Sequence, residues 1–139
     1  MYLSMYDFTK TKEFNDVVYT GLNGTNQTMR MKFQKWYYPF KHKSVWNVIF
    51  YITNKRKDVY KFREQTGTDG IKSLLWAKNC LLNFINNDLD RTEDNVIEVC
   101  WDDRKRKNVY VRSLTPLGFK LSRSVNRDIL LLKINATIK

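Results

Sequence analysis

The sequence predicts an α+β fold, with a mostly antiparallel sheet built from two hairpins and one main amphipathic helix at about residues 70–86 packed on one face. Two apolar, strand-like runs are each followed by a basic cluster and a second short strand-like stretch. Strand, polar cluster, strand is the order typical of a β-hairpin. Between these two predicted hairpins lies one segment with helical periodicity. Such segregation of strands and helix is typical of the α+β class.

The two basic clusters have nearly the same sequence. Lys55-Arg56-Lys57-Asp58-Val59-Tyr60 recurs fifty residues later as Lys105-Arg106-Lys107-Asn108-Val109-Tyr110. The apolar runs at residues 48–52 and 96–101 precede them, and short alternating stretches follow. The pattern predicts two hairpins with cationic tips, at residues 54–57 and 102–107. Six matched positions are too few to indicate an internal duplication.

The segments before the first cluster differ in how clearly they can be interpreted. Residues 1–28 fit a loosely packed N-terminal arm or a first hairpin strand, and the sequence leaves both open. From Met29, apolar and polar side chains alternate as far as Gln34, which predicts a strand with one buried face. Pro39 is expected to end that strand. Residues 45–53 are rich in β-branched and aromatic side chains, which predicts a central strand.

The helix is predicted from Gly70 to Asn86. Apolar residues recur at i, i+3 and i+4 from Ile71 to Ile85, interrupted only by Lys78, and Thr68 or Asp69 can cap the first turn. A polar, acidic connector follows, and then the second predicted hairpin, with strands at 96–101 and 109–114. A turn at 115–118 and strands at 119–123 and 128–134 complete the chain.

Size and hydropathy place the chain among single-domain globular proteins. At 139 residues, 42% of them hydrophobic, it is long enough to bury a core, and we expect one domain. No apolar run reaches the eighteen or so residues of a membrane-spanning helix. The N-terminus has no basic segment followed by an apolar core. The expected compartment is therefore the cytoplasm, with no membrane partner.

The positive charge is concentrated in two segments. Residues 41–63 carry seven basic residues and one acid, a net charge of +6, whereas residues 104–127 carry eight basic residues and no acid. The rest of the chain is slightly acidic, because the total is +11. Such segregation is typical of a surface that contacts a polyanion. The alternative is that Lys and Arg are common at exposed turns without any binding role.

The candidate contact residues follow from this distribution. They are the basic side chains of the two predicted tips and of the strands that follow the second one. Tyr37 and Tyr38 are candidates for stacking on unpaired bases, although the aromatic cluster around them is also suited to a core. The candidate contacts are Lys55, Arg56, Lys57, Arg104, Lys105, Arg106, Lys107, Arg112, Lys120, Arg123 and Arg127.

No residue is predicted to be catalytic, and neither a metal nor a cofactor is expected. His42 is the single histidine, and two cysteines give no metal-ligand spacing. Cys80 and Cys100 are interpreted as buried reduced thiols, with a disulfide as the alternative. Gly67 and Gly70 lack the Lys-Ser/Thr of a phosphate-binding loop. Glu98, Asp102 and Asp103 faintly resemble a nuclease acidic cluster, but a turn or ion pairs with the adjacent cations is the simpler interpretation.

The sequence therefore predicts a small, non-enzymatic accessory protein that binds DNA or RNA through its backbone phosphates. The alternative is a protein-binding module or inhibitor that docks its basic surface on an acidic partner protein. The Lys-, Asn- and Tyr-rich composition is common among phage-encoded and other viral accessory proteins, and a homodimer through edge strands is compatible with either function.

Overall fold

The computed structural model describes residues 8–22, 28–38, 43–54, 57–59, 70–101, 104–124 and 127–137. The chain forms two compact units, each assembled from two segments. The first unit is Met1–Lys32 with Phe50–Asp88, and the second is Phe33–Ile49 with Leu89–Lys139. Two long strands contribute residues to both units, and the prediction of one domain stays a prediction.

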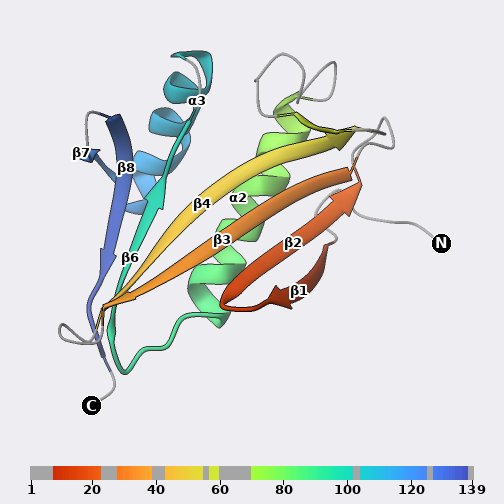
Figure 1. Ribbon diagram of the computed structural model, residues 1–139. Helices are drawn as coiled ribbons and strands as arrows, with labels where there is room; N and C mark the ends of the chain where they lie inside the picture. Colours follow the sequence, from red (N-terminus) through yellow and green to blue (C-terminus); the bar gives the residue numbers. More distant parts are fainter. Residues whose placement is uncertain are drawn as a thin grey trace. The chain divides into compact units, whose positions relative to one another are not determined.

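Within the described residues, eight strands form one sheet with a mostly antiparallel pattern (Figure 1). The order of hydrogen-bonded neighbours is β1-β2-β3-β4-β6-β8-β7, and β5 pairs with β4. The α+β class and the predominance of antiparallel pairing are thereby confirmed. The strands are β1 (Thr9–Glu13), β2 (Asp16–Leu22), β3 (Thr28–Tyr38), β4 (Lys43–Asn54), β5 (Lys57–Val59), β6 (Asp94–Val99), β7 (Lys120–Ser124) and β8 (Arg127–Ile134).

The N-terminal segment, which the sequence left as an arm or a strand, contains a hairpin. β1 pairs antiparallel with β2, from Thr9 opposite Thr20 to Glu13 opposite Asp16. The connection is Phe14-Asn15, and Phe14 adopts a left-handed backbone with φ 59°. A two-residue loop between antiparallel strands needs positive φ, which glycine or asparagine usually supplies. In this hairpin a phenylalanine occupies that position.

The first predicted hairpin is present. β4 pairs antiparallel with β5, with Ile52 opposite Val59 and Asn54 opposite Lys57. The pairing agrees with the turn expected at residues 54–57. Lys55 and Arg56, two of the predicted contact residues, lie outside the described residues, and so does the side chain of Lys57.

The second predicted hairpin is wrong. Residues 104–107 of the tip predicted at 102–107, and the returning strand predicted at 109–114, belong to helix α3 (Arg104–Leu114). Arg and Lys favour a helix, whereas Val-Tyr-Val-Arg is too short an alternation to distinguish a strand. Tyr110 and Leu114, four residues apart, are both buried, which identifies the helical face. The prediction of one main helix was therefore also incomplete.

Strand β6, instead of pairing in a hairpin, lies between β4 and β8. It runs parallel to β4, with Val45 opposite Val96 and Val48 opposite Val99, and antiparallel to β8. A parallel pair requires a crossover connection, and helix α2 (Gly70–Asn87) lies within that connection. This helix confirms the predicted segment at about 70–86.

The core of the first unit lies between α2 and the strands of that unit, and Figure 1 shows the helix along one face of these strands. Trp76, Cys80 and Phe84 of α2 are fully buried. The Trp76 and Phe50 rings lie 6.3 Å apart between centroids. The backbone of Gly21 in β2 approaches the Trp76 indole so closely that a Cβ on Gly21 would lie 2.7 Å from Nε1.

The second unit has its own core and a polar anchor beside it. Trp46, Ile97 and Leu130 from β4, β6 and β8 are buried. Asn95, 1% exposed, accepts a hydrogen bond from Trp46 Nε1 over 3.1 Å. Its Nδ2 donates to the carbonyl oxygens of Asp90 and Glu93, at 2.8 and 3.2 Å. Because a buried amide must satisfy its polar groups, these bonds fix the loop that leads into β6.

Within the described part of the chain, neither helix has the length and apolar character needed to cross a membrane.

Candidate nucleic-acid interface

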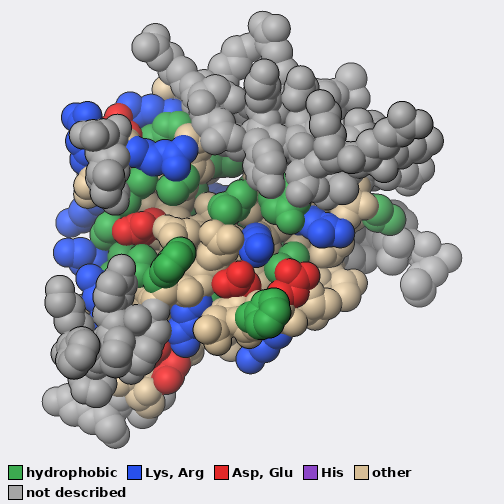
Figure 2. Space-filling view, in the orientation of Figure 1, with side chains coloured by type: hydrophobic (Ala, Val, Ile, Leu, Met, Phe, Trp, Pro, Cys, Tyr) green, Lys and Arg blue, Asp and Glu red, His purple; other side chains and the backbone are tan. Residues whose placement is uncertain are grey.

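The structure brings part of the predicted basic set together in the second unit. Five of the predicted contact residues with described side chains come from α3, β7 and β8, and we call this group the basic edge. Figure 2 shows Lys and Arg side chains gathered over these elements, at the left of the view. The basic edge consists of Lys107, Arg112, Lys120, Arg123 and Arg127.

Two polar contacts hold the basic edge to its neighbours. Lys107 of α3 forms an ion pair with Asp128 of β8, with Nζ 3.1 Å from Oδ2. Arg127 Nη2 donates to the carbonyl oxygen of Trp101 over 3.4 Å. The strand register places Arg123 directly opposite Asp128, so both side chains lie on one face of the β7–β8 pair. Asp128 is thus a counter-charge within the group.

Exposure leaves most of the basic edge open to a partner. Arg112, Lys120, Arg123 and Arg127 are exposed, and the Lys107 side chain is 33% exposed. β7 is the outermost strand on its side of the sheet. Charged side chains on an edge strand also prevent pairing with other chains. That role explains Lys120 and Arg123 but not Arg112, which lies on a helix.

For three more of the predicted contact residues, the structure describes the backbone but not the side chain. Arg104, Lys105 and Arg106 belong to the first turn of α3, but their side chains lie outside the described part. The similar sequences at 55–60 and 105–110 therefore do not form two equivalent hairpins, because the second is helical.

An exposed aromatic side chain lies in the same strand as the two predicted stacking residues. Tyr37 and Tyr38 belong to β3, but their side chains lie outside the described part. The adjacent Trp36 is 57% exposed. Met29, Met31 and Phe33 are buried on one face, so the same alternation places Trp36 on the other. Extending the period-two pattern by one more repeat would have identified this tryptophan from sequence.

The possible acidic cluster receives no support as a metal site. Asp102 and Asp103 lie outside the described residues, as does His42. Glu98 is half-exposed and lies within hydrogen-bonding distance of the Asn47 amide. Among the residues that the structure describes, no three His, Cys, Asp or Glu side chains lie close enough together to bind a metal ion. Cys80 is buried, Cys100 is half-buried, and they do not form a disulfide.

A second group of polar residues, in the first unit, contributes to its structure. The Tyr19 hydroxyl donates to Asp88 and, over 2.9 Å, to Asn83. Burial, together with the Asp88 carboxylate, raises the pKa of Tyr19 well above its usual range. Tyr19 is fully buried, so its hydroxyl serves hydrogen bonds inside the first unit.

Comparison with known proteins found no similar chain: no protein-family model, curated protein or solved structure matches this sequence or fold.

Proposed function

We propose that the protein binds nucleic acid without catalysing a reaction, and that the basic edge holds the phosphate backbone. The observation that carries this proposal is the convergence of Lys107 and Arg112 of α3 with the basic residues of β7 and β8 in one unit. Contacts of this kind provide affinity by releasing counterions condensed on the nucleic acid. They also set position without reading sequence.

The charge balance of these elements supports a polyanionic partner. Residues 104–134 contain nine basic side chains and one acid, Asp128. That acid is already paired with Lys107. The positive electrostatic potential of these cations attracts a negatively charged ligand. This attraction extends over about one Debye length, which is about 8–10 Å at physiological salt.

The proposal is tested by binding of labelled DNA and RNA at about 50 mM salt and then at increasing salt, because phosphate contacts weaken steeply as salt rises. The wild-type protein should bind both, with affinity that falls linearly on a double-logarithmic plot. Arg112→Glu with Arg123→Glu should weaken binding to every sequence and reduce the slope by about one for each lost phosphate contact.

The matched control for each single arginine substitution is Lys12→Glu, which makes the same charge change at an exposed position of β1 in the first unit. This variant should lose much less affinity than either arginine variant. Absence of binding to DNA and RNA at low salt would refute the proposal. Nuclease-resistant capture of an acidic protein partner would then favour the alternative, in which the same cations contact a protein.

A further inference from the structure

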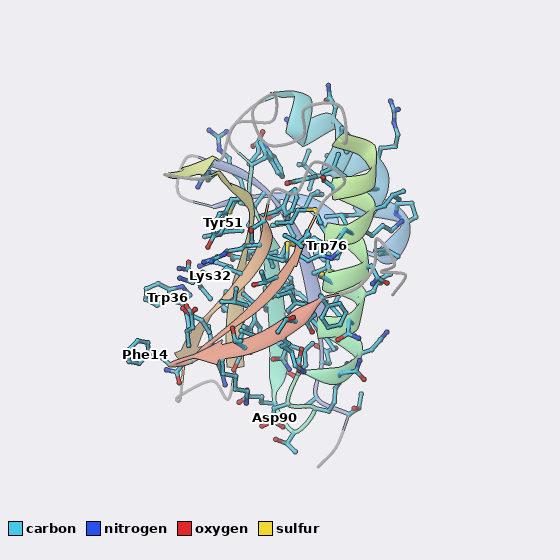
Figure 3. All side chains as sticks on the ribbon, turned by 90° about the vertical axis from the view of Figure 1, so that its right-hand side faces the viewer. Phe14, Lys32, Trp36, Tyr51, Trp76 and Asp90 are labelled. Carbon is cyan, nitrogen blue, oxygen red and sulfur yellow. The ribbon has the colours of Figure 1, made fainter. Side chains whose placement is uncertain are left out.

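Trp36 is a large aromatic side chain exposed on a β-strand of the second unit. It is 57% exposed, and Figure 3 shows its ring projecting away from the sheet. Tryptophan is highly buried on average in folded proteins. Two other tryptophans, Trp46 and Trp76, are at most 5% exposed. The exposure of Trp36 therefore calls for a specific explanation.

Trp36 is held in place by a neighbouring strand. With the Asn47 amide oriented to satisfy both neighbours, Trp36 Nε1 donates to the Asn47 oxygen over 2.8 Å. The Asn47 nitrogen then donates to Glu98 Oε2 over 2.9 Å. The indole is thus anchored through its N–H while its ring stays exposed. A fixed ring loses little conformational entropy when a ligand stacks on it.

Strand register defines the surface around this ring. Asn47 of β4 lies opposite Glu98 of β6, Glu98 opposite Leu131 of β8, and Leu131 opposite Lys120 of β7. Residues directly opposite one another project from the same face. We call the face that carries this row, together with Trp36, the open sheet face. The row from β4 to β7 crosses three strand spacings, about 14 Å.

More cations lie on the same face. Lys133 lies two residues from Leu131 along β8, and Arg127 lies four residues from it. Because residues an even number apart in a strand share a face, both cations project from the open sheet face. Lys43 is also on this face, opposite Asp94. Among the described residues of this face in the second unit, the acids are Glu98, which is hydrogen-bonded to Asn47, and Asp94, whose Oδ1 accepts from the Ala136 backbone over 2.8 Å. The cations outnumber the acids, and both acids already have hydrogen-bond partners.

Helix α3 packs on the other face of these strands. Lys107 of α3 forms an ion pair with Asp128. Asp128 is two residues from the buried Leu130, so both side chains project from the helix side of the sheet, away from the open sheet face. Figure 1 shows α3 behind β6 and β8, and Figure 3 shows it on the side of the strands away from Trp36. Asn47, Glu98 and Leu131 are half-exposed, whereas Trp46, Ile97 and Leu130 on the helix side are buried. Val96 is buried beside the row, which gives this face an apolar floor.

We infer that the open sheet face binds an unpaired nucleic-acid strand by stacking a base on Trp36, with Lys120, Arg127 and Lys133 contacting its phosphates. The inference rests on the proposed function and names the form of nucleic acid. An aromatic ring beside a track of cations is the arrangement by which proteins bind single strands, because every base has a π-face. In a duplex the bases are stacked on each other, so Trp36 could not reach one without unpairing it.

The test compares a labelled oligothymidylate, an oligouridylate and a DNA duplex by fluorescence anisotropy, with wild type and Trp36→Ala. Loss of one stacked base corresponds to roughly a 5- to 150-fold loss of affinity. We expect that loss for Trp36→Ala on one or both single strands, and less than about a twofold change on the duplex. Trp36→Phe should retain most of the affinity, because it keeps an aromatic face.

The matched control is Leu121→Ala. Leu121 is 54% exposed in β7 but lies opposite the buried Leu130, on the helix side of the sheet. This variant should bind single strands like wild type. Circular dichroism of Trp36→Ala should match wild type, since the side chain is largely exposed.

Two outcomes separate this inference from the proposed function. If wild type binds and the double arginine variant binds weakly, but Trp36→Ala binds single strands unchanged, the inference is wrong and the proposed function stands. If Trp36→Ala loses affinity equally for single strands and for the duplex, the inference is also wrong, because stacking requires an unpaired base. If wild type binds none of the three probes, both fail.

Discussion

Tyr19 of β2 donates a hydrogen bond to Asp88, the residue that follows helix α2, although a carboxylate at a helix C-terminus is unfavourable. Lys10 of β1 offsets that charge, with Nζ 2.7 Å from Asp88 Oδ1. The phenol and the ammonium group together tie the end of α2 to the β1–β2 hairpin. This tie lies entirely within the first unit.

Tyr19→Phe is expected to destabilise the protein. It removes the buried donor shared by Asp88 and Asn83, at a cost of about 1–3 kcal/mol in the free energy of unfolding. Urea denaturation monitored by circular dichroism measures the change. Lys10→Met is the comparison and should cost less than about 1 kcal/mol, because that pair is partly exposed. A smaller loss for Tyr19→Phe than for Lys10→Met would contradict this account.

Stability should fall at alkaline pH. Burial raises the pKa of Tyr19 above its usual 10.0 and the pKa of Cys80 above its usual 9.0. In the unfolded chain both groups deprotonate near their usual values, so above those values the unfolded state binds fewer protons. The contribution of each group is complete below its usual pKa and declines above it. Urea midpoints between about pH 8 and 11 should show this decline, and Tyr19→Phe should reduce it.

Gly21→Ala should disrupt the packing of α2 on β2. The added Cβ would lie 2.7 Å from Nε1 of the fully buried Trp76. Overpacking of this kind costs typically about 1–3 kcal/mol. Thermal or urea unfolding measures the loss. Ser122→Ala, at an exposed position in β7, is the control and should change stability by less than about 0.5 kcal/mol.

Phe14→Gly should stabilise the protein. Phe14 combines φ 59° with a fully exposed side chain, so it has backbone strain and no packing to offset it. The left-handed conformation costs a residue with a Cβ roughly 1–2 kcal/mol, which glycine avoids. The gain is expected to be about 1 kcal/mol, because glycine also increases the entropy of the unfolded chain. Phe14→Ala keeps the Cβ, so its gain in stability should be much smaller. Equal stability for the two variants would show that φ is not strained.

Asp128→Asn should strengthen nucleic-acid binding, in contrast to the arginine variants. The substitution removes the single acid of residues 104–134 and releases Lys107 from its ion pair. The loss of a half-exposed pair should change stability by less than about 1 kcal/mol. Affinity for DNA or RNA at low salt should rise by about two- to fivefold. Unchanged or weaker binding would place the phosphate contact away from the basic edge.

Local sequence patterns were sufficient to predict those elements whose apolar residues follow one clear helical or strand period. The α2 helix follows from the i, i+3, i+4 spacing between Ile71 and Ile85. β3 follows from its alternation, and β4 from its β-branched run. The charge of residues 104–127 also comes directly from the sequence, and it still provides the basis for the proposed function.

The second basic cluster shows where local patterns were insufficient. Lys105–Tyr110 resembles Lys55–Tyr60, yet the structure places it in a helix. A short run of Lys, Arg and Val is compatible with either element, and burial of Tyr110 and Leu114 against the rest of the unit decides between them.

The α+β class, the position of α2 and the concentration of positive charge can be predicted from the amino-acid sequence, because they depend on composition and on spacing along the chain. The three-dimensional fold was needed to place β6 between β4 and β8, to align Asn47, Glu98 and Lys120 in one row, and to bring Trp36 within hydrogen-bonding distance of Asn47. Neighbours across strands come from distant parts of the chain. Their register is set by which faces can be buried together, a property of the whole fold.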